Sequence, residues 1–369
     1  MATARIMSKR LEVAEDPQVI NDYYYQQGWT EGLPIVCPTE ERVLRMLEYT
    51  DRAPGELVGQ LAPVYAEATV EKIAINGVMA GCLPQHMPVL IAAAEAIIEK
   101  DFNLYGVQTT TNPVTPLFIV NGPIAKELDI NSGPSCMGPC KRANAVIGRA
   151  MRLLMINVGG AKPGAVDKAT FGQPGKFTFC IAEHEEANPW EPLHVERGFD
   201  RQDSTVTACG VASVINVITT PELIPGWKDG IQILAMVADN MSAMGSNNFM
   251  SGIGEPMVAF SPESAGILKK DGYSKQDVKQ YLFDKSSRTA ASLPPFTVDR
   301  MRHRRSVGPS VDRFYITERA EDIMIIVCGG LLAAHTVFMP TFGTTQAQTK
   351  PIAKKDGARV RSVEEFKAK

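Results

Sequence analysis

The sequence predicts an α/β fold, with a mixed or mostly parallel sheet and flanking helices. Short apolar runs bounded by glycine, proline or polar residues are typical of buried strands, and they occur at 117–120, 176–182, 204–209, 212–218, 257–260, 323–328 and 336–339. Segments with apolar residues at helical spacing lie between many of them, at 70–79, 87–99, 143–156, 222–244 and 262–270. Strands and helices that interleave in this way favour the α/β class but leave the strand order undetermined.

Start and stop signals support individual elements. Thr39, Thr69 and Ser274 each precede a helical pattern and suit an N-cap, because their hydroxyl can accept from a free backbone N–H. Glycines at 81 and 159–160 suit the ends of two helices. The run at 32–38 reads as a short buried strand between breakers, whereas the basic, proline-containing stretch 286–312 reads as a loop.

Three regions follow from this reading. Residues 1–30 form an N-terminal arm, 31–345 an α/β catalytic domain, and the lysine-rich 346–369 a flexible C-terminal tail. The strongly polar stretch at 195–205 is an alternative boundary that would subdivide the domain. Tyr23–Tyr25 is expected to form an interface or packing patch.

Composition excludes several classes of protein. The net charge of −3 leaves no basic surplus for nucleic acid, and no apolar run reaches the roughly 18 residues of a membrane helix. The first residues lack the apolar region of a secretory signal, and seven scattered cysteines do not form a disulfide framework. We therefore expect a cytoplasmic protein with reduced thiols, assembled as a homo- or hetero-oligomer.

The stretch from Asn131 to Asn144 (NSGPSCMGPCKRAN) carries the strongest functional signal. Pro139 suits the first position of a helix, which predicts that Cys140 lies in the first turn, where free N–H groups favour an anion. Lys141 and Arg142 would add positive charge, so the pKa of this thiol should be low. Cys136 would be its resolving partner if the loop folds back.

Other readings of this loop stay open. The cysteines are also consistent with small buried residues of a glycine-rich turn. Alternatively, the loop binds an anion at the start of a helix through its backbone N–H groups. The loop departs from a Walker A sequence, so nucleotide binding is not expected. Asn131, Ser132, Lys141, Arg142 and Asn144 are expected to contact the substrate.

A second cluster follows the 176–182 strand, where ligands of α/β folds commonly bind. Glu183, His184 and His194 lie in a stretch rich in glutamate, which suits acid/base catalysis or a divalent transition metal. The metal ligands would be Cys136, Cys140, His184 and His194. Pro189 and Pro192 exclude a regular helix, and a solvated surface loop is the alternative.

Weaker candidates remain. Thr110 and Asn112, in the small polar stretch 108–112, are expected, with Asn121-Gly122 after the next strand, to contact substrate or simply to form a turn. Cys328-Gly-Gly330 follows the last strongly apolar run, where the glycines would let a ligand approach and Cys328 would belong to the core.

The chain resembles a functionally uncharacterised bacterial family along nearly its whole length. The resemblance rests on Glu31-Gly-Leu-Pro34, Pro38-Thr39, Ala68-Thr-Val-Glu-Lys72, Met79-Ala-Gly-Cys82, Asn121-Gly-Pro-Ile124, Ile130-Asn-Ser-Gly133, Arg142-Ala-Asn144, Asn157-Val-Gly-Gly160, Pro174-Gly-Lys176 and the stretch 190–198 (WEPLHVERG). Such proteins occur beside small proteins with a UGSC or CGSC motif, which implies one subunit of a thiol- or selenol-dependent enzyme. The family pattern does not usually carry two cysteines at 134–140, so Cys136 and Cys140 are a departure from it.

Three functional hypotheses follow. The first is an enzyme, or enzyme subunit, that performs thiol-based redox or nucleophilic chemistry on a small organic molecule, with Cys140 as the reactive thiol and Cys136 as its partner. The second is a metal-dependent lyase or hydratase that uses the loop cysteines or the His184/His194/glutamate cluster. The third is a non-catalytic scaffold for a redox partner.

Overall fold

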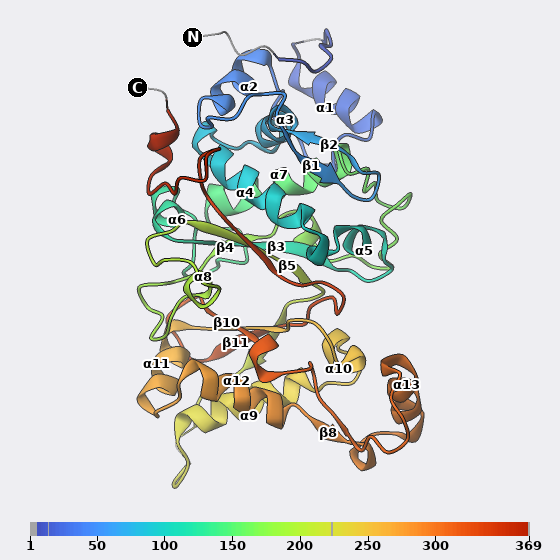
Figure 1. Ribbon diagram of the computed structural model, residues 1–369, viewed down its shortest axis with the longest axis vertical. Helices are drawn as coiled ribbons and strands as arrows, with labels where there is room; N and C mark the ends of the chain where they lie inside the picture. The colour runs from blue at the N-terminus through green and yellow to red at the C-terminus, as the bar shows by residue number, and fades with distance from the viewer. Residues whose placement is uncertain (1–5, 14, 223, 368–369) are drawn as a thin grey trace.

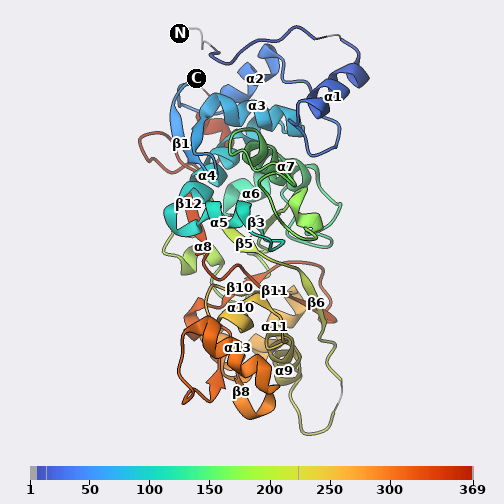
Figure 2. The ribbon, with the colours of Figure 1, turned by 90° about the vertical axis from the view of Figure 1, so that its right-hand side faces the viewer.

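Two four-stranded sheets face each other at the centre of the molecule, and helices cover the outer face of each. This arrangement comes from a computed structural model that describes residues 6–13, 15–222 and 224–367. Figures 1 and 2 show the resulting stack of helices, sheet, sheet and helices from two directions. We call the side chains between the two sheets the inter-sheet layer.

The first half contains the sheet with strand order β12-β5-β3-β4, formed by Gln348–Pro351, Thr205–Val211, Thr115–Asn121 and Cys180–Ala182. Strands β3 and β4 are parallel, and β5 is antiparallel to both β3 and β12. The larger helices of this half are α1 (Pro17–Gln26), α2 (Glu40–Leu47), α3 (Val70–Ala80), α4 (Met87–Ile98) and α7 (Arg142–Asn157). It also holds the hairpin β1 (Leu57–Leu61) and β2 (Ala66–Thr69), with the short helices α5 (Leu104–Thr109), α6 (Pro123–Glu127) and α8 (Leu193–Glu196).

The second half contains the sheet with strand order β10-β7-β11-β6, formed by Met324–Val327, Met257–Phe260, His335–Met339 and Ile215–Ile218. Strands β10 and β7 are parallel, and β11 is antiparallel to β7 and β6. Its helices are α9 (Asp229–Met241), α10 (Asn247–Ser251), α11 (Pro262–Lys270), α12 (Lys275–Lys285) and α13 (Pro295–Arg305). A small pair, β8 (Arg288–Thr289) and β9 (Arg313–Phe314), lies beside α13, and single 3₁₀ turns occur at Pro84–His86, Lys100–Phe102, Pro174–Lys176, Ala290–Ser292, Ala320–Asp322 and Val363–Phe366.

The alternation of side chains explains why the central strands are apolar throughout. In β3, Phe118 and Val120 pack with the helices, whereas Leu117 and Ile119 belong to the inter-sheet layer. A strand covered on both faces has no solvated side, so it reads as a continuous apolar run. The same alternation in the other strands completes the inter-sheet layer with Ile181, Cys209, Val211, Met257, Ala259, Met324, Ile326, Cys328 and Met339.

The α/β class with flanking helices is confirmed, and of the two alternatives for the sheet the mixed one holds. Among the strands described, only β3–β4 and β10–β7 pair in parallel within these two sheets. No helix separates β10 from β11 or β5 from β6, so these connections are not the helical crossovers that parallel strands require. The chain passes from the first sheet to the second at 212–214 and returns at 340–347, rather than dividing at 195–205.

The predicted flexible tail is an integral part of the fold. Strand β12 pairs with β5, and Ile352, Val360, Val363 and Phe366 are buried in the helical core of the first half. Figure 1 follows this segment, in red, from the second half across β5 and α4 to the end that also holds the N-terminus. The lysine-rich sequence does not look like a strand. Strand β12 lies at a sheet edge, where charged side chains are common.

Other local predictions were also wrong. Residues 32–38 form no strand and have no regular secondary structure, and the stretch 286–312 contains helix α13. The N-terminal arm is attached to the domain, because the carboxylate of Glu71 in α3 accepts from the backbone N–H groups of Met7 and Ser8, at 2.8 Å each.

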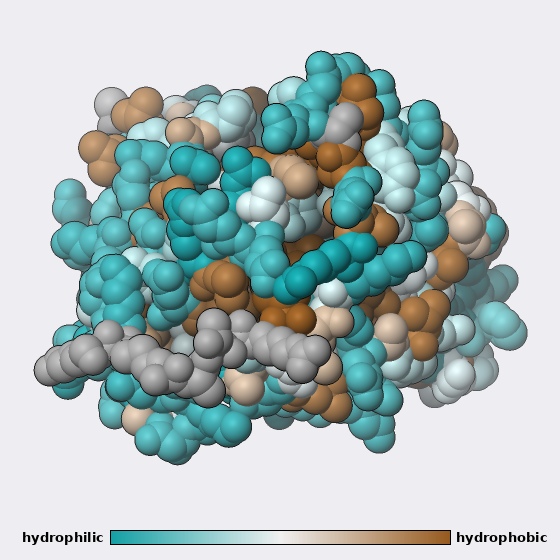
Figure 3. Space-filling model, turned by 90° about the horizontal axis from the view of Figure 1, so that it is seen from above, coloured by the Kyte–Doolittle hydropathy of each residue, from teal (hydrophilic) through white to brown (hydrophobic). Residues whose placement is uncertain are grey.

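The tyrosine cluster is partly a packing feature. Tyr24 lies edge to face with Trp29, with ring centroids 5.4 Å apart, and both contact the core, whereas Tyr25 is 65% exposed. Figure 3 looks down on the end of the molecule near α1 and α2, where hydrophilic side chains dominate and apolar ones lie scattered among them. None of the helices in the described residues is both long and apolar enough to span a membrane.

Replacing Ile352 with alanine should lower the free energy of unfolding by about 2–4 kcal/mol, because the side chain is 1% exposed and its removal leaves a cavity. Chemical denaturation followed by circular dichroism measures this loss. Arg361→Ala, at an exposed position of the same segment, serves as the control and should change little. Equal stability of Ile352→Ala and wild type would mean that the segment is a detachable tail after all.

Candidate active site

Polar side chains gather at one end of the inter-sheet layer. Because β3 and β4 are parallel, the residues at their carboxyl ends, Asn121 and Glu183, lie at the same edge of the first sheet. Both follow the alternation that points into the inter-sheet layer, and Thr205 lies opposite Asn121 in the strand register. From the second sheet, Cys328 follows β10 on the face shared with Met324 and Ile326.

Two backbone hydrogen bonds fasten the two sheets together at this end. The N–H of His184 donates to the carbonyl of Val327 at 2.8 Å, and the N–H of Gly329 donates to the carbonyl of Ser132 at 2.8 Å. Gly329 has φ of +95°, a conformation that favours glycine, so the chain turns sharply directly after Cys328. The end of β10 is thereby held against both the end of β4 and the cysteine loop.

The side chain of Asn144 fixes the cysteine loop, which we define as residues 131–138. Its amide nitrogen donates to the carbonyls of Asn131 (3.0 Å), Cys136 (3.4 Å) and Cys180 (3.1 Å), and its oxygen accepts from the N–H of Asn131 at 2.7 Å. The side chain of Asn131 in turn spans the loop, with its oxygen 2.9 Å from the N–H of Gly133 and its amide 2.8 Å from the carbonyl of Pro134. These two asparagines, expected to bind substrate, instead use their side chains to hold the loop.

The loop places the thiol of Cys136 beside that of Cys328. Hydrogen bonding from Cys328, together with the backbone N–H groups of Gly329, Cys136 and Met137, lowers the pKa of Cys136 despite its burial. Cys328 behaves in the opposite way, because the bond to Cys136, burial and the nearby Glu183 carboxylate all raise its pKa. The two thiols are therefore neighbours with different ionisation tendencies.

The partner predicted for Cys136 was wrong. Cys136 adjoins Cys328, about 190 positions later in the chain, and Cys140 is exposed outside the layer. Helix α7 begins only at Arg142, after an extended Lys141 at the N-cap, so Cys140 does not lie in the first turn as predicted. Lys141 pairs with Asp129 at 2.8 Å and Arg142 donates to the carbonyl of Gly81 at 3.0 Å, so each of these cations already has a partner.

Glu183 is the most buried acid of the site, with 4% of its surface exposed. Its oxygens accept from the amides of Asn121 (2.7 Å) and Asn188 (2.8 Å) and from the N–H of Leu193 (2.8 Å). Burial raises the pKa of this carboxyl, although Lys275 and the hydrogen bonds oppose the shift.

Glu185 shares the amide of Asn121, at 3.0 Å, and also accepts from the N–H of Gly122 at 2.6 Å. Gly122 has φ of +86°, and a Cβ there would lie 2.2 Å from the carbonyl oxygen of Asp203, so only glycine fits. Glu183 and Glu185 thus accept from the same Asn121 amide but have different surroundings. In many enzymes, different surroundings allow one carboxyl group of a pair to act as the acid and the other as the base.

The two histidines of the cluster do not share one role. His194 is fully buried, and its Nδ1 lies 4.0 Å from the Glu185 carboxylate without a hydrogen bond. Burial lowers its pKa, and the carboxylate of Glu185 only partly offsets this. The His184 side chain is 29% exposed, with its Nδ1 3.9 Å from Glu186.

The predicted metal ligands do not assemble. Across residues 6–13, 15–222 and 224–367, no group of three or more His, Cys, Asp or Glu side chains has an arrangement suited to a metal ion. Cys140 is exposed just beyond the cysteine loop, whereas Cys136 lies in the inter-sheet layer. The proposed set of Cys136, Cys140, His184 and His194 is therefore not a metal centre in this structure.

Thr110 and Asn112 lie at the opposite end of the sheet. They precede β3, whereas Asn121 ends it, and a seven-residue strand spans about 20 Å. Asn112 bonds to Asn247 at 3.0 Å and to the N–H of Val114 at 3.0 Å, which is the turn-forming role. These residues do not belong to the site at the cysteines.

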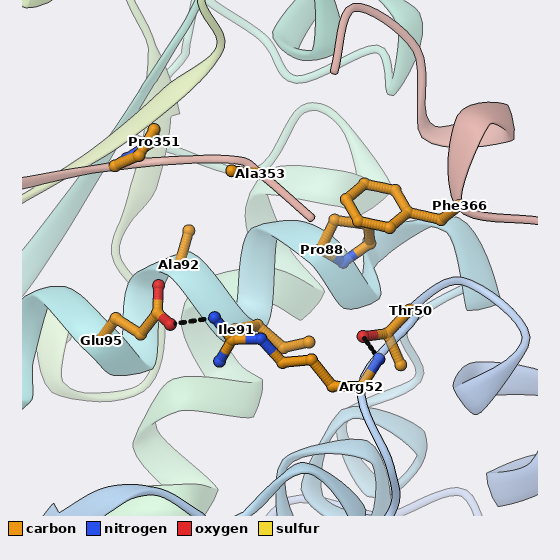
Figure 4. A pocket seen from close by; sticks show the side chains of 9 residues that line it. All are labelled: Thr50, Arg52, Pro88, Ile91, Ala92, Glu95, Pro351, Ala353 and Phe366. Carbon is orange, nitrogen blue, oxygen red and sulfur yellow. Dashed lines mark hydrogen bonds and ion pairs between the residues drawn. The ribbon is translucent and has the colours of Figure 1, made fainter. Parts of the chain in front are cut away.

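Two surface cavities lie away from the thiols, on the helical side of the first sheet. One of about 10 Å³ lies between α4 and the C-terminal segment, and Figure 4 shows Arg52 reaching across it to Glu95, at 2.6 Å. A shallow groove of about 400 Å³ adjoins it and is lined by cations that include Lys350 and Arg359. Lys350 pairs with Glu99 and Arg359 with Asp203, so these cations do not form a free anion site.

Comparison with known proteins adds no relative. No known protein family matches the chain, and no curated protein is similar enough to count as related. The resemblance drawn from the sequence motifs therefore stays a prediction.

Sequence reasoning missed Thr205, which looks like an ordinary strand residue, and gave Cys328 only a role in the core. Asn121 was noted as a candidate substrate contact but not as a neighbour of Glu183. Asn121-Gly122 and Cys328-Gly329 each follow an apolar run with a polar residue and a glycine. That shared pattern was the available signal, but it does not show that the two strand ends meet.

Replacing Asn144 with alanine should destabilise the fold by about 1–3 kcal/mol, because buried carbonyls lose their donor. It should also free the cysteine loop, so Cys136 should react faster with a bulky maleimide under native conditions. The matched control is Lys141→Ala, which removes only an exposed ion pair. Unchanged stability and unchanged Cys136 labelling in Asn144→Ala would show that the amide does not hold the loop.

The lowered pKa of His194 predicts a pH dependence of stability. The unfolded chain takes up a proton on this ring below about pH 6.5, whereas the folded protein does so only at lower pH. Wild type should therefore lose stability relative to His194→Gln as the pH falls from 7.5 to 5.5. Denaturant titrations of both proteins at several pH values measure the difference, and parallel curves would contradict the lowered pKa.

Proposed function

We propose that the chain is an enzyme, or a subunit of one, that performs thiol-based redox or nucleophilic chemistry on a small organic molecule. Cys136 is the attacking thiolate and Cys328 is its partner. The observation that carries this proposal is the meeting of two thiols from opposite halves of the fold, where hydrogen bonding lowers the pKa of Cys136 while the neighbouring thiol, burial and a carboxylate raise that of Cys328. Unlike pKa values in a cysteine pair are typical of reactive dithiols.

The chemistry that such a pair supports is thiol–disulfide exchange or a related substitution. The Cys136 thiolate attacks one sulfur of a small disulfide, forms a mixed disulfide and releases the other half as a thiolate. Cys328 then loses its proton and attacks the Cys136 sulfur, which releases the second half as a thiolate. The products are two thiols and a Cys136–Cys328 disulfide, which an external thiol or selenol must reduce before the next cycle.

Burial limits the substrate to small molecules. Cys136 and Cys328 are each 5% exposed, so a bulky group cannot reach either sulfur without movement of the cysteine loop. The small thiol or selenol protein implied by the family resemblance would serve as the reductant, in a hetero-oligomer. All seven cysteines are free, which suits the reducing cytoplasm.

Geometry favours Cys136 over Cys140 as the nucleophile. The N–H groups of Gly329 and Met137 serve Cys136, whereas Cys140 precedes the N-cap of α7 and is exposed. A metal-dependent lyase has no ligand cluster among the described residues to support it, and no specific observation favours a non-catalytic scaffold.

A small aliphatic disulfide such as cystamine tests the assignment. Wild type should lose two thiols and yield a linked Cys136–Cys328 peptide, and Cys328→Ser should stop at an adduct on Cys136. Cys136→Ser should form neither product, since Cys328 then lacks its partner. Peptide mapping by mass spectrometry reads all three results.

Cys140→Ser is the matched control, because it removes a cysteine of the same segment but not of the pair. It should react like wild type. An adduct on Cys140, with Cys136 and Cys328 untouched, would refute the proposed pair and return the reactive role to Cys140.

A further inference from the structure

We propose that Glu183 is a positioning residue for the thiol pair: from the end of β4, held against the end of β10, its carboxylate favours a protonated Cys328 and so leaves the negative charge on Cys136. This inference rests on the proposed dithiol function and adds an order to its two steps. It assigns to Glu183 an effect on charge rather than contact with substrate.

Geometry brings Glu183 and Cys328 to the same place from opposite sheets. Glu183 continues the inter-sheet face of β4, and Cys328 continues that of β10. The 2.8 Å bond from the N–H of His184 to the carbonyl of Val327 fixes the two strand ends against each other. Both side chains are nearly inaccessible, with 4% and 5% exposed, so little water screens the interaction.

The hydrogen bonds around Glu183 favour its carboxylate form. The Asn121 amide, the Asn188 amide and the Leu193 N–H all donate to it. A proton on this carboxyl would find no acceptor among these three groups. Lys275 of α12 adds a favourable positive charge, whereas Glu185 and burial oppose ionisation.

Charge then separates the two thiols. A carboxylate beside Cys328 disfavours a second negative charge there, so Cys328 keeps its S–H and donates it to Cys136. Cys136 faces no comparable acid and gains the N–H groups of Gly329 and Met137. His194 faces Glu185 rather than the thiols, so it does not enter this balance directly.

The same arrangement orders the reaction. While Cys136 is a thiolate, its charge and the charge of Glu183 both hold the proton on Cys328. Once Cys136 has formed a mixed disulfide, its charge is gone, and burial and Glu183 alone still oppose ionisation of Cys328. Cys328 therefore becomes easier to ionise only after the first step, which is when it must attack.

The test isolates Cys328 in a Cys136→Ser background and follows its alkylation by iodoacetamide against pH, read by peptide mass spectrometry. Adding Glu183→Gln should shift the midpoint of the rate profile to lower pH, by about one unit, which means roughly tenfold more Cys328 thiolate at a fixed pH below the midpoint. The control is Glu186→Gln, whose carboxylate is exposed and paired with Lys126; it should leave the midpoint in place. An unchanged midpoint in folded Glu183→Gln would overturn the inference.

Further measurements keep a misfolded variant from leaving the question open. If Glu183→Gln does not fold, Glu183→Asp in the same Cys136→Ser background replaces it, since the shorter side chain draws the carboxylate back from Cys328. The Cys328 midpoint should then move to lower pH by a smaller amount, and an unchanged midpoint would also overturn the role of Glu183. Failure of the proposed function looks different, because Cys136 of otherwise wild-type protein would then form no adduct with the small disulfide.

Discussion

The structure depends on the packing of two sheets against each other along one apolar layer. Leucine, isoleucine, methionine and alanine fill that layer from both sides, and the burial of such side chains is the main favourable term in folding. At one end the layer holds polar and ionisable side chains instead of apolar ones, because Asn121, Glu183 and Cys328 lie there at the ends of their strands. Two backbone hydrogen bonds, from His184 to Val327 and from Gly329 to Ser132, hold this end closed.

This constraint explains how two distant cysteines acquire different properties. Cys136 is on a loop that a single buried asparagine fixes to the end of the first sheet. Cys328 follows a strand of the second sheet, and the backbone of its turn at Gly329 helps to lower the pKa of Cys136. The thiols therefore share a boundary between two halves of the fold, and neither half contains the pair on its own.

Local patterns in the sequence predicted the class of fold and much of its core. Apolar runs such as 117–120 and 323–328 became buried strands, and the N-caps at Thr39, Thr69 and Ser274 each accept a backbone N–H as expected. The cysteine loop and the strand end at Glu183 were also recognised as neighbours of a site. The evidence for these features lies within about ten residues of chain.

Long-range pairing could not be predicted in this way. The antiparallel return of β11, the strand β12 in a lysine-rich segment, and the meeting of Cys136 with Cys328 all depend on contacts between distant parts of the chain. Cys140 seemed the better partner for Cys136 only because it is near in sequence. The connection between α6 and α7, residues 128–141, instead directs Cys136 inward and leaves Cys140 at the surface.

The most direct test of the central claim is a disulfide map of the native protein after titration with substoichiometric diamide. The account predicts that the first intramolecular bond links Cys136 to Cys328, and that unfolding the protein before oxidation abolishes this preference. A first bond between Cys136 and Cys140, or oxidation confined to Cys140, would contradict the claim that the two sheets bring the reactive pair together.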